Sequence, residues 1–143
     1  MLSKGITVLA VLPILAISFV PAFALTELER VSIIDPKLVN VFGVSLGNLI
    51  NVDQQIQISA DIINNQVKSQ NFYYLVQIKN ESDLVVSFGW ISGQLTPNQK
   101  FSPSLSWTPV SSGEFTAEIF VWEGFPINPS ALSGYTTMQI NVS

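Results

Sequence analysis

The chain has 143 residues, a formal net charge of −4, and neither cysteine nor histidine. The absence of these two residue types excludes Cys–His and Ser–His–Asp nucleophiles, Cys/His zinc sites and blue-copper centres. The few basic residues are scattered, which argues against nucleic acid as a partner, because its binding requires clustered positive charge.

The N-terminal segment has the features of an export signal. A single positive charge lies at Lys4, residues 5–25 carry no charged side chain, and small residues stand at Ala22 and Ala24. This pattern predicts a signal peptide at residues 1–24 and one exported domain at residues 25–143. We therefore expect the protein outside the cytoplasm, extracellular or associated with the cell surface.

Two other interpretations of this segment remain open. The uncharged stretch is long enough to span a bilayer if it is not cleaved, which would leave a membrane anchor facing outside. Alternatively, Lys4-Gly5 resembles the processing point of archaeal class III signals, which would leave the apolar segment as a filament-forming helix. Pro13 argues against that helix, because proline interrupts the helical hydrogen bonds.

Short runs of β-branched and aromatic residues, separated by turn residues, predict strands along the rest of the chain. The clearest strand is residues 54–64, where Ile56, Ile58, Ala60 and Ile62 alternate with polar residues, as in a half-buried strand. The other expected strands are 30–35, ended by Pro36; the extended segment 38–44; 72–79 and 84–91, forming a hairpin; 99–107; 114–123; and 135–142.

Seven or eight short strands at spacings near ten residues predict an all-β fold, an antiparallel sandwich of two sheets. Four residues are expected in its core: Ile58, Trp107, Phe115 and Ile119. Trp107 is the principal candidate, because an indole buries a large apolar area.

Two segments carry a family resemblance. The run Trp107-Thr108-Pro109, followed by residues 113–121 (GEFTAEIFV), resembles a signature of bacterial and archaeal immunoglobulin-like modules of the fibronectin type III and CARDB types. Residues 52–58 (VDQQIQI) are similar to the start of their second strand. With the leader, the chain resembles secreted proteins of ammonia-oxidising archaea. The resemblance implies an immunoglobulin-like fold and a role in adhesion, spacing or docking, without catalytic residues.

The strand alternation also predicts an aromatic patch on the outer side of one sheet. If Phe115 and Ile119 face the core, the alternate residues of the same strand face outward. The candidate patch consists of Tyr73, Leu75, Trp90, Phe120 and Trp122. Exposed apolar patches often mark interaction sites, and Trp and Tyr are favoured anchors. The alternative is that the loop at residues 124–134 or the segment 25–39 covers the patch.

Other polar features have simpler explanations. Glu81 and Asp83 share a turn, and we expect them to be solvated charges rather than a calcium site, so no metal or cofactor is predicted. Asn80 and Asn141 begin Asn-X-Ser sequons and are candidate glycosylation sites. The uncharged last strand, 135–143, is either paired within the domain or available for strand addition.

These observations predict a non-catalytic exported module, interacting or structural, that binds a protein or a cell-envelope glycan. The alternative is an envelope or filament assembly subunit that keeps its apolar N-terminal segment and associates with itself. An enzyme is not expected, because the carboxylates are confined to turns and strand ends. A membrane contact is expected only if the leader is retained.

Overall fold

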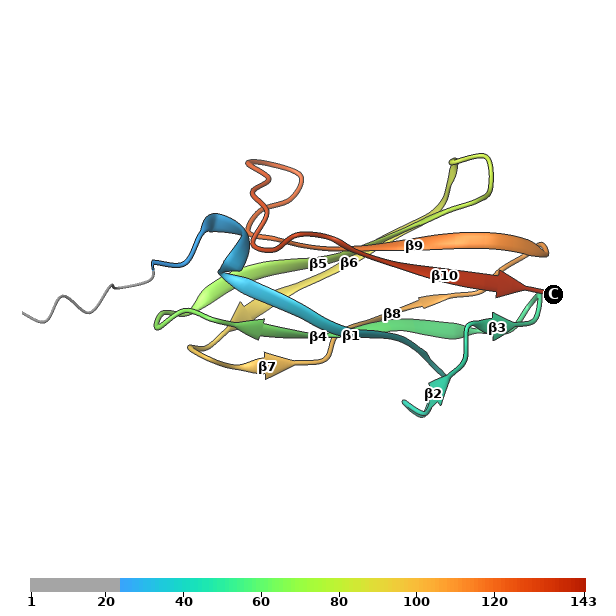
Figure 1. Ribbon diagram of the computed structural model, residues 1–143, viewed down its shortest axis with the longest axis horizontal. Helices are drawn as coiled ribbons and strands as arrows, with labels where there is room; N and C mark the ends of the chain where they lie inside the picture. Colours follow the sequence, from blue (N-terminus) through green and yellow to red (C-terminus); the bar gives the residue numbers. More distant parts are fainter. Residues whose placement is uncertain (1–23) are drawn as a thin grey trace, which may run out of the picture.

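The computed structural model describes residues 24–143, so the predicted leader lies, apart from Ala24, outside the described residues. The described part contains ten strands in two stacked sheets (Figure 1), which confirms the all-β two-sheet sandwich. No helix among residues 24–143 is long and apolar enough to cross a membrane. The elements are the 3-10 turn Glu27–Glu29, β1 Val31–Val39, β2 Ser45–Leu46, β3 Leu49–Ile50, β4 Ile56–Asn64, β5 Gln70–Lys79, β6 Val85–Leu95, β7 Lys100–Phe101, β8 Ser104–Trp107, β9 Gly113–Trp122 and β10 Thr136–Val142.

The strand order defines which face carries the candidate site. One sheet has the order β2-β1-β4-β7, and β8 also pairs with β4. The other sheet has the order β3-β10-β9-β5-β6, with β6 at its edge. The pairs β5–β6, β5–β9 and β9–β10 are antiparallel, as the predicted hairpin requires, whereas the short β3 runs parallel to β10.

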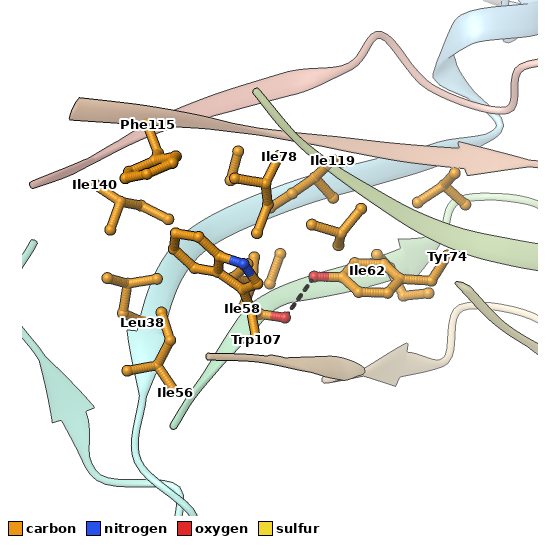
Figure 2. Packing of buried hydrophobic residues seen from close by; sticks show 14 of the residues in the cluster. Leu38, Ile56, Ile58, Ile62, Tyr74, Ile78, Trp107, Phe115, Ile119 and Ile140 are labelled. Carbon is orange, nitrogen blue, oxygen red and sulfur yellow. Dashed lines mark hydrogen bonds between the residues drawn. The ribbon is translucent and has the colours of Figure 1, made fainter. Parts of the chain in front are cut away.

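The core lies between the two sheets and follows the alternation of the strands. Ile56, Ile58, Ala60 and Ile62 of β4 are at most 1% exposed. From the opposite sheet, Tyr74 lies among them, and its hydroxyl donates a hydrogen bond of 3.1 Å to the Ile58 carbonyl (Figure 2). The bond joins the two sheets and gives the buried Tyr74 hydroxyl a hydrogen-bond partner within the core.

All four residues that the sequence assigns to the core lie there. Ile58 and Ile119 are at most 1% exposed, Phe115 is 6% exposed and Trp107 is 9% exposed. The Trp107 and Phe115 rings meet edge to face, with 5.2 Å between centroids. This arrangement, visible in Figure 2, is a favourable geometry for two aromatic rings.

The first strand does not end at Pro36, contrary to the sequence expectation. It continues to Val39 through an irregularity between Ile34 and Lys37, where Asp35 adopts a φ of 51°. A bulge leaves residues unpaired, so a proline that cannot donate a ladder hydrogen bond is accommodated there.

The segment at residues 99–107 is not one strand but two. Pro103 separates β7 from β8, and both short strands pair with β4. Their side chains cover the polar face of β4. Ser59 donates to the Pro103 carbonyl, while Asp61 accepts a hydrogen bond from Ser102 and pairs with Lys100 at 3.1 Å. As a result Asp61 is only 7% exposed, although the alternation predicted a half-buried strand.

The last strand is paired within the domain. Seven residues of β10 are in register with β9, and its final two also pair with β3. The structure therefore shows internal pairing of the whole strand on its β9 side, whereas residues 136–140 have no strand partner from the described residues on the other side. The longest free edge of this sheet lies at β6.

Candidate functional site

Aromatic side chains from four segments gather on the outer side of the β3-β10-β9-β5-β6 sheet. Strand register places Tyr73 opposite Trp122, and Leu75 between Trp90 and Phe120. We call the set of contacting rings the aromatic face; it consists of Tyr73, Phe88, Trp90, Phe120, Trp122, Phe125 and Tyr135.

Phe125 is the central residue of the aromatic face. Its ring centroid lies 5.1 Å from that of Trp90, 5.7 Å from Phe88, 6.1 Å from Trp122 and 6.3 Å from Tyr73. The sequence prediction missed this residue, because it lies in a loop where strand alternation gives no orientation. The sequence offered one signal, namely that Phe125 lies three residues after Trp122 at the aromatic end of a predicted strand.

Hydrogen bonds hold the loop that carries Phe125 against the sheet. The Glu123 N–H donates to the Ser130 carbonyl at 2.7 Å, and the Leu132 N–H donates to the Val121 carbonyl at 2.9 Å. Leu132 is fully buried and anchors the loop in the core. In Figure 1 the loop, drawn in orange between β9 and β10, rises above the sheet at the end near the N-terminal segment.

An arginine from the N-terminal segment supports the same loop. Arg30 pairs with Glu123 at 3.0 Å, and it also donates to the Ser130 hydroxyl and the Ala131 carbonyl. The hydrogen bond from Arg30 is the main reason why the pKa of Glu123 lies below its ordinary value. Glu123 is therefore an anionic support of the loop at neutral pH rather than a proton donor.

The loop covers the patch only in part. Trp90 is 49% exposed, Phe88 44% and Tyr135 61%, whereas Tyr73, Phe120 and Trp122 are half-buried. Leu75 departs from the expectation of an exposed patch residue, since it is 1% exposed and offers no accessible surface. It is shorter than its two aromatic cross-strand partners, which cover it. The segment 31–39 forms β1 of the opposite sheet and does not cover the patch.

An open groove of about 480 Å³ lies beside Phe125. Its walls combine the Tyr73 and Phe125 side chains with hydrogen-bonding groups of Asn71, Ser92 and Glu123. Binding sites for small organic groups typically combine apolar walls with a few polar groups in this way.

The other half of the same outer face is polar. Glu118 accepts a hydrogen bond from Gln77 and pairs with Lys79, both at 3.0 Å. The hydrogen bond to Glu118 is the main reason why the pKa of Lys79 is raised. The sheet thus presents aromatic rings at one end and a neutralised, hydrogen-bonded network at the other.

The two sequons lie in different settings. Asn80 begins the hairpin loop between β5 and β6, and its side-chain oxygen accepts hydrogen bonds from the Ser82 and Leu84 N–H groups. The oxygen stabilises the turn, while the amide nitrogen, to which a glycan would attach, makes no hydrogen bond within the described residues. Asn141 lies in β10 between Glu114 and Leu49 and is half-buried. Modification of either residue stays a prediction.

The carboxylates do not form a cluster of the kind that binds metal. Within residues 24–143, no group of three or more His, Cys, Asp or Glu side chains is close enough to hold a metal ion. Glu81 accepts a hydrogen bond from the Glu114 N–H, and Asp83 lies 3.5 Å from Lys79. These acids therefore have structural partners at the hairpin.

Comparison with known proteins identifies the fold. No protein-family model matches the sequence, and no curated protein sequence matches it. Among solved structures, the C-terminal domain of wzt is similar with a TM-score of 0.67 and 16% identity, over 80% of this chain and 74% of that one. A CARDB domain from Pyrococcus furiosus, solved in complex with di-metal ions, gives a TM-score of 0.55 and 13% identity, over 83% of this chain and 97% of that one.

A cycloisomaltooligosaccharide glucanotransferase from Paenibacillus sp., complexed with cycloisomaltoheptaose, gives a TM-score of 0.60 and 15% identity. The match covers 78% of this chain but only 14% of that enzyme. At such identities the likeness concerns the fold alone. The chain therefore has an immunoglobulin-like β-sandwich similar to those of a CARDB domain and the wzt C-terminal domain.

Proposed function

We propose that this protein is an exported, non-catalytic interaction module that acts at the cell envelope and binds its ligand through the aromatic face. The carrying observation is that seven rings meet on one outer sheet face while Phe88, Trp90 and Tyr135 remain at least 44% exposed. Solvent-exposed aromatic clusters are costly unless a partner covers them, and Trp and Tyr are frequent binding anchors.

Of the two ligand classes that the sequence predicts, a glycan fits the groove better than a protein. A sugar ring has apolar C–H faces and hydroxyl groups at its rim. In the groove, Phe125 and Tyr73 can contact the C–H face of a sugar. Asn71, Ser92 and Glu123 can form hydrogen bonds with its hydroxyl groups. Binding would consist of apolar contact with polar contacts at the rim, without bond chemistry.

Glycan-array binding tests this proposal, with protein produced from the full chain in a host that exports it. Trp90→Ala is the test variant, because the Trp90 ring lies 5.1 Å from that of Phe125 in the groove wall. Since Trp90 is half-exposed, its removal should also cost less stability than removal of Trp107. Phe42→Ala is the matched control, because Phe42 is an aromatic residue that is 87% exposed beyond the end of β1 in the opposite sheet. We expect wild type and Phe42→Ala to retain the same glycans and Trp90→Ala to lose at least tenfold in affinity.

Failure to bind any glycan, combined with Trp90-dependent capture of an envelope protein, would assign the face to a protein ligand. Equal binding by all three proteins would show that the aromatic face is not the site. Export is tested separately by N-terminal sequencing of native material. A start at Leu25 supports a free exported domain, whereas a start at Ile6 or Met1 indicates the alternative of an anchored or filament-forming subunit.

A further inference from the structure

Strand β6 has one unpaired side along its whole length. It pairs with β5 from Val85 to Leu95 and is the last strand of its sheet, with no strand of the described residues on its other side. At eleven residues it is about twice as long as a typical strand. The outer N–H and C=O groups of such an edge are a template for pairing with another chain.

Two of the usual protections of an edge strand, charged residues and proline, are missing from β6. Its sequence, VVSFGWISGQL, contains no charged residue and no proline. The other sheet edges are shorter or interrupted: β2, β3 and β7 have two residues each, β8 has four, β10 is free only at residues 136–140, and β1 is interrupted at Asp35-Pro36. Charges, prolines, bulges and short length are the features that normally prevent edge pairing. β6 combines length with the absence of charge and proline. The one irregularity in its pairing lies near its beginning, where Ser87 pairs with Ile78 and Val85 with Lys79, so that Val86 has no partner in β5.

The exposed side chains of β6 are also apolar. Val85, Val86, Phe88 and Trp90 are 51%, 46%, 44% and 49% exposed. They continue the aromatic face up to the free edge, because Phe88 and Trp90 belong to it. A strand added at this edge would cover part of this surface and extend the same sheet.

We propose that β6 pairs antiparallel with β6 of a second copy, across a two-fold axis near Gly89. An antiparallel pair of identical strands is compatible with two-fold symmetry, and the absence of charge means that no like charges oppose each other. This register places Phe88 of each copy opposite Trp90 of the other, and Val86 opposite Ser92. Such aromatic cross-strand pairs stabilise sheets. The register also joins the aromatic faces of the two copies into one continuous surface.

A second copy is favoured over an unrelated strand because the β6 edge is complementary to itself in charge and in its exposed rings. Phe88 and Trp90 are exposed and lie on either side of Gly89, so the two-fold axis brings the ring of each copy against a ring of the other at the centre of the pair. The dimer and the ligand share Phe88 and Trp90 of the aromatic face, but the dimer is formed by the backbone edge of β6 and requires no bound ligand.

A charge-swap experiment tests the dimer. The double variant Val86→Lys/Ser92→Lys places lysines opposite lysines in the proposed register, and Val86→Glu/Ser92→Glu places glutamates opposite glutamates. Both residues are exposed, so the variants retain the core, which far-UV circular dichroism and thermal unfolding verify. The matched control is Val67→Lys/Val110→Lys, which adds the same charge at residues that are 93% and 85% exposed in loops.

Sedimentation equilibrium of the exported protein across concentrations from about 1 to 500 μM measures the association. We expect wild type and the control to dimerise, each charged β6 variant alone to lose at least tenfold in association, and an equimolar mixture of the two to form a heterodimer. A monomeric wild type, an undiminished dimer in the lysine variant, or a mixture that stays monomeric would overturn the proposal. Glycan binding is measured on wild type and not on the Ser92 variants, because Ser92 also lines the groove beside Phe125. Association of wild type is measured without glycan, so a monomeric protein that binds glycan would overturn the dimer alone, and a dimer that binds no glycan would overturn the glycan proposal alone.

Discussion

Replacement of Trp107 by alanine is the most direct test of the sandwich core. Trp107 is 9% exposed, lies opposite Ile56 across the β4–β8 pair, and contacts the Phe115 ring edge to face. The change removes the indole and leaves a cavity between the sheets. Such truncations cost about 3–5 kcal/mol, out of a total stability of about 5–15 kcal/mol for a domain.

Thermal and urea unfolding, followed by far-UV circular dichroism, measure this loss. For a domain of this size, 1 kcal/mol corresponds to about 4 °C in Tm, so Trp107→Ala should lower Tm by about 12–20 °C. Trp107→Phe should lose less, because it keeps a ring against Phe115. The control Trp90→Ala removes an equally large side chain that is 49% exposed, and a loss of about 1–2 kcal/mol is expected.

A decrease of only one or two degrees for Trp107→Ala would refute its assignment to the core. An equal decrease for Trp107→Ala and Trp90→Ala would refute the distinction between the core and the aromatic face.

Two further predictions concern buried polar groups. The hydrogen bond from Ser102, followed by the interaction with Lys100, lowers the pKa of Asp61 in the folded protein. The stabilisation that ionised Asp61 gives the folded state is therefore fully present above the unfolded-state pKa of about 3.9, and it is lost as pH falls through the lower folded-state value. Urea unfolding between pH 7 and pH 2.5 should show that Asp61→Asn loses less unfolding free energy on acidification than wild type. An equal dependence of unfolding free energy on pH in the two proteins would contradict this. Tyr74→Phe removes the hydroxyl that donates to the Ile58 carbonyl and should cost about 1 kcal/mol in the same assay at pH 7, whereas an unaltered unfolding midpoint would show that the bond does not contribute.

The sequence by itself determined the class of fold and the direction of most strand side chains. Successive residues of a strand point to opposite faces, so one apolar alternation orients a whole strand. For this reason Ile58, Phe115 and Ile119 could be assigned to the core, and Phe120 and Trp122 to the opposite side, before any pairing was known. The absence of histidine and cysteine likewise restricted the chemistry without reference to structure.

Only the tertiary structure decided what lies beside what. Phe125 joins the aromatic face because its loop is held against the sheet, in part by hydrogen bonds from the distant Arg30 to Glu123, Ser130 and Ala131. Leu75 is buried because its neighbours on both adjacent strands are large rings. The same holds for the free edges: among the described strands, β6 is unpaired on one side along its whole length, whereas β10 is unpaired on one side only at residues 136–140. Strand order depends on contacts between segments far apart in the chain. Alternation is a local property that the backbone imposes residue by residue, whereas pairing, coverage and edges arise only when all strands are assembled.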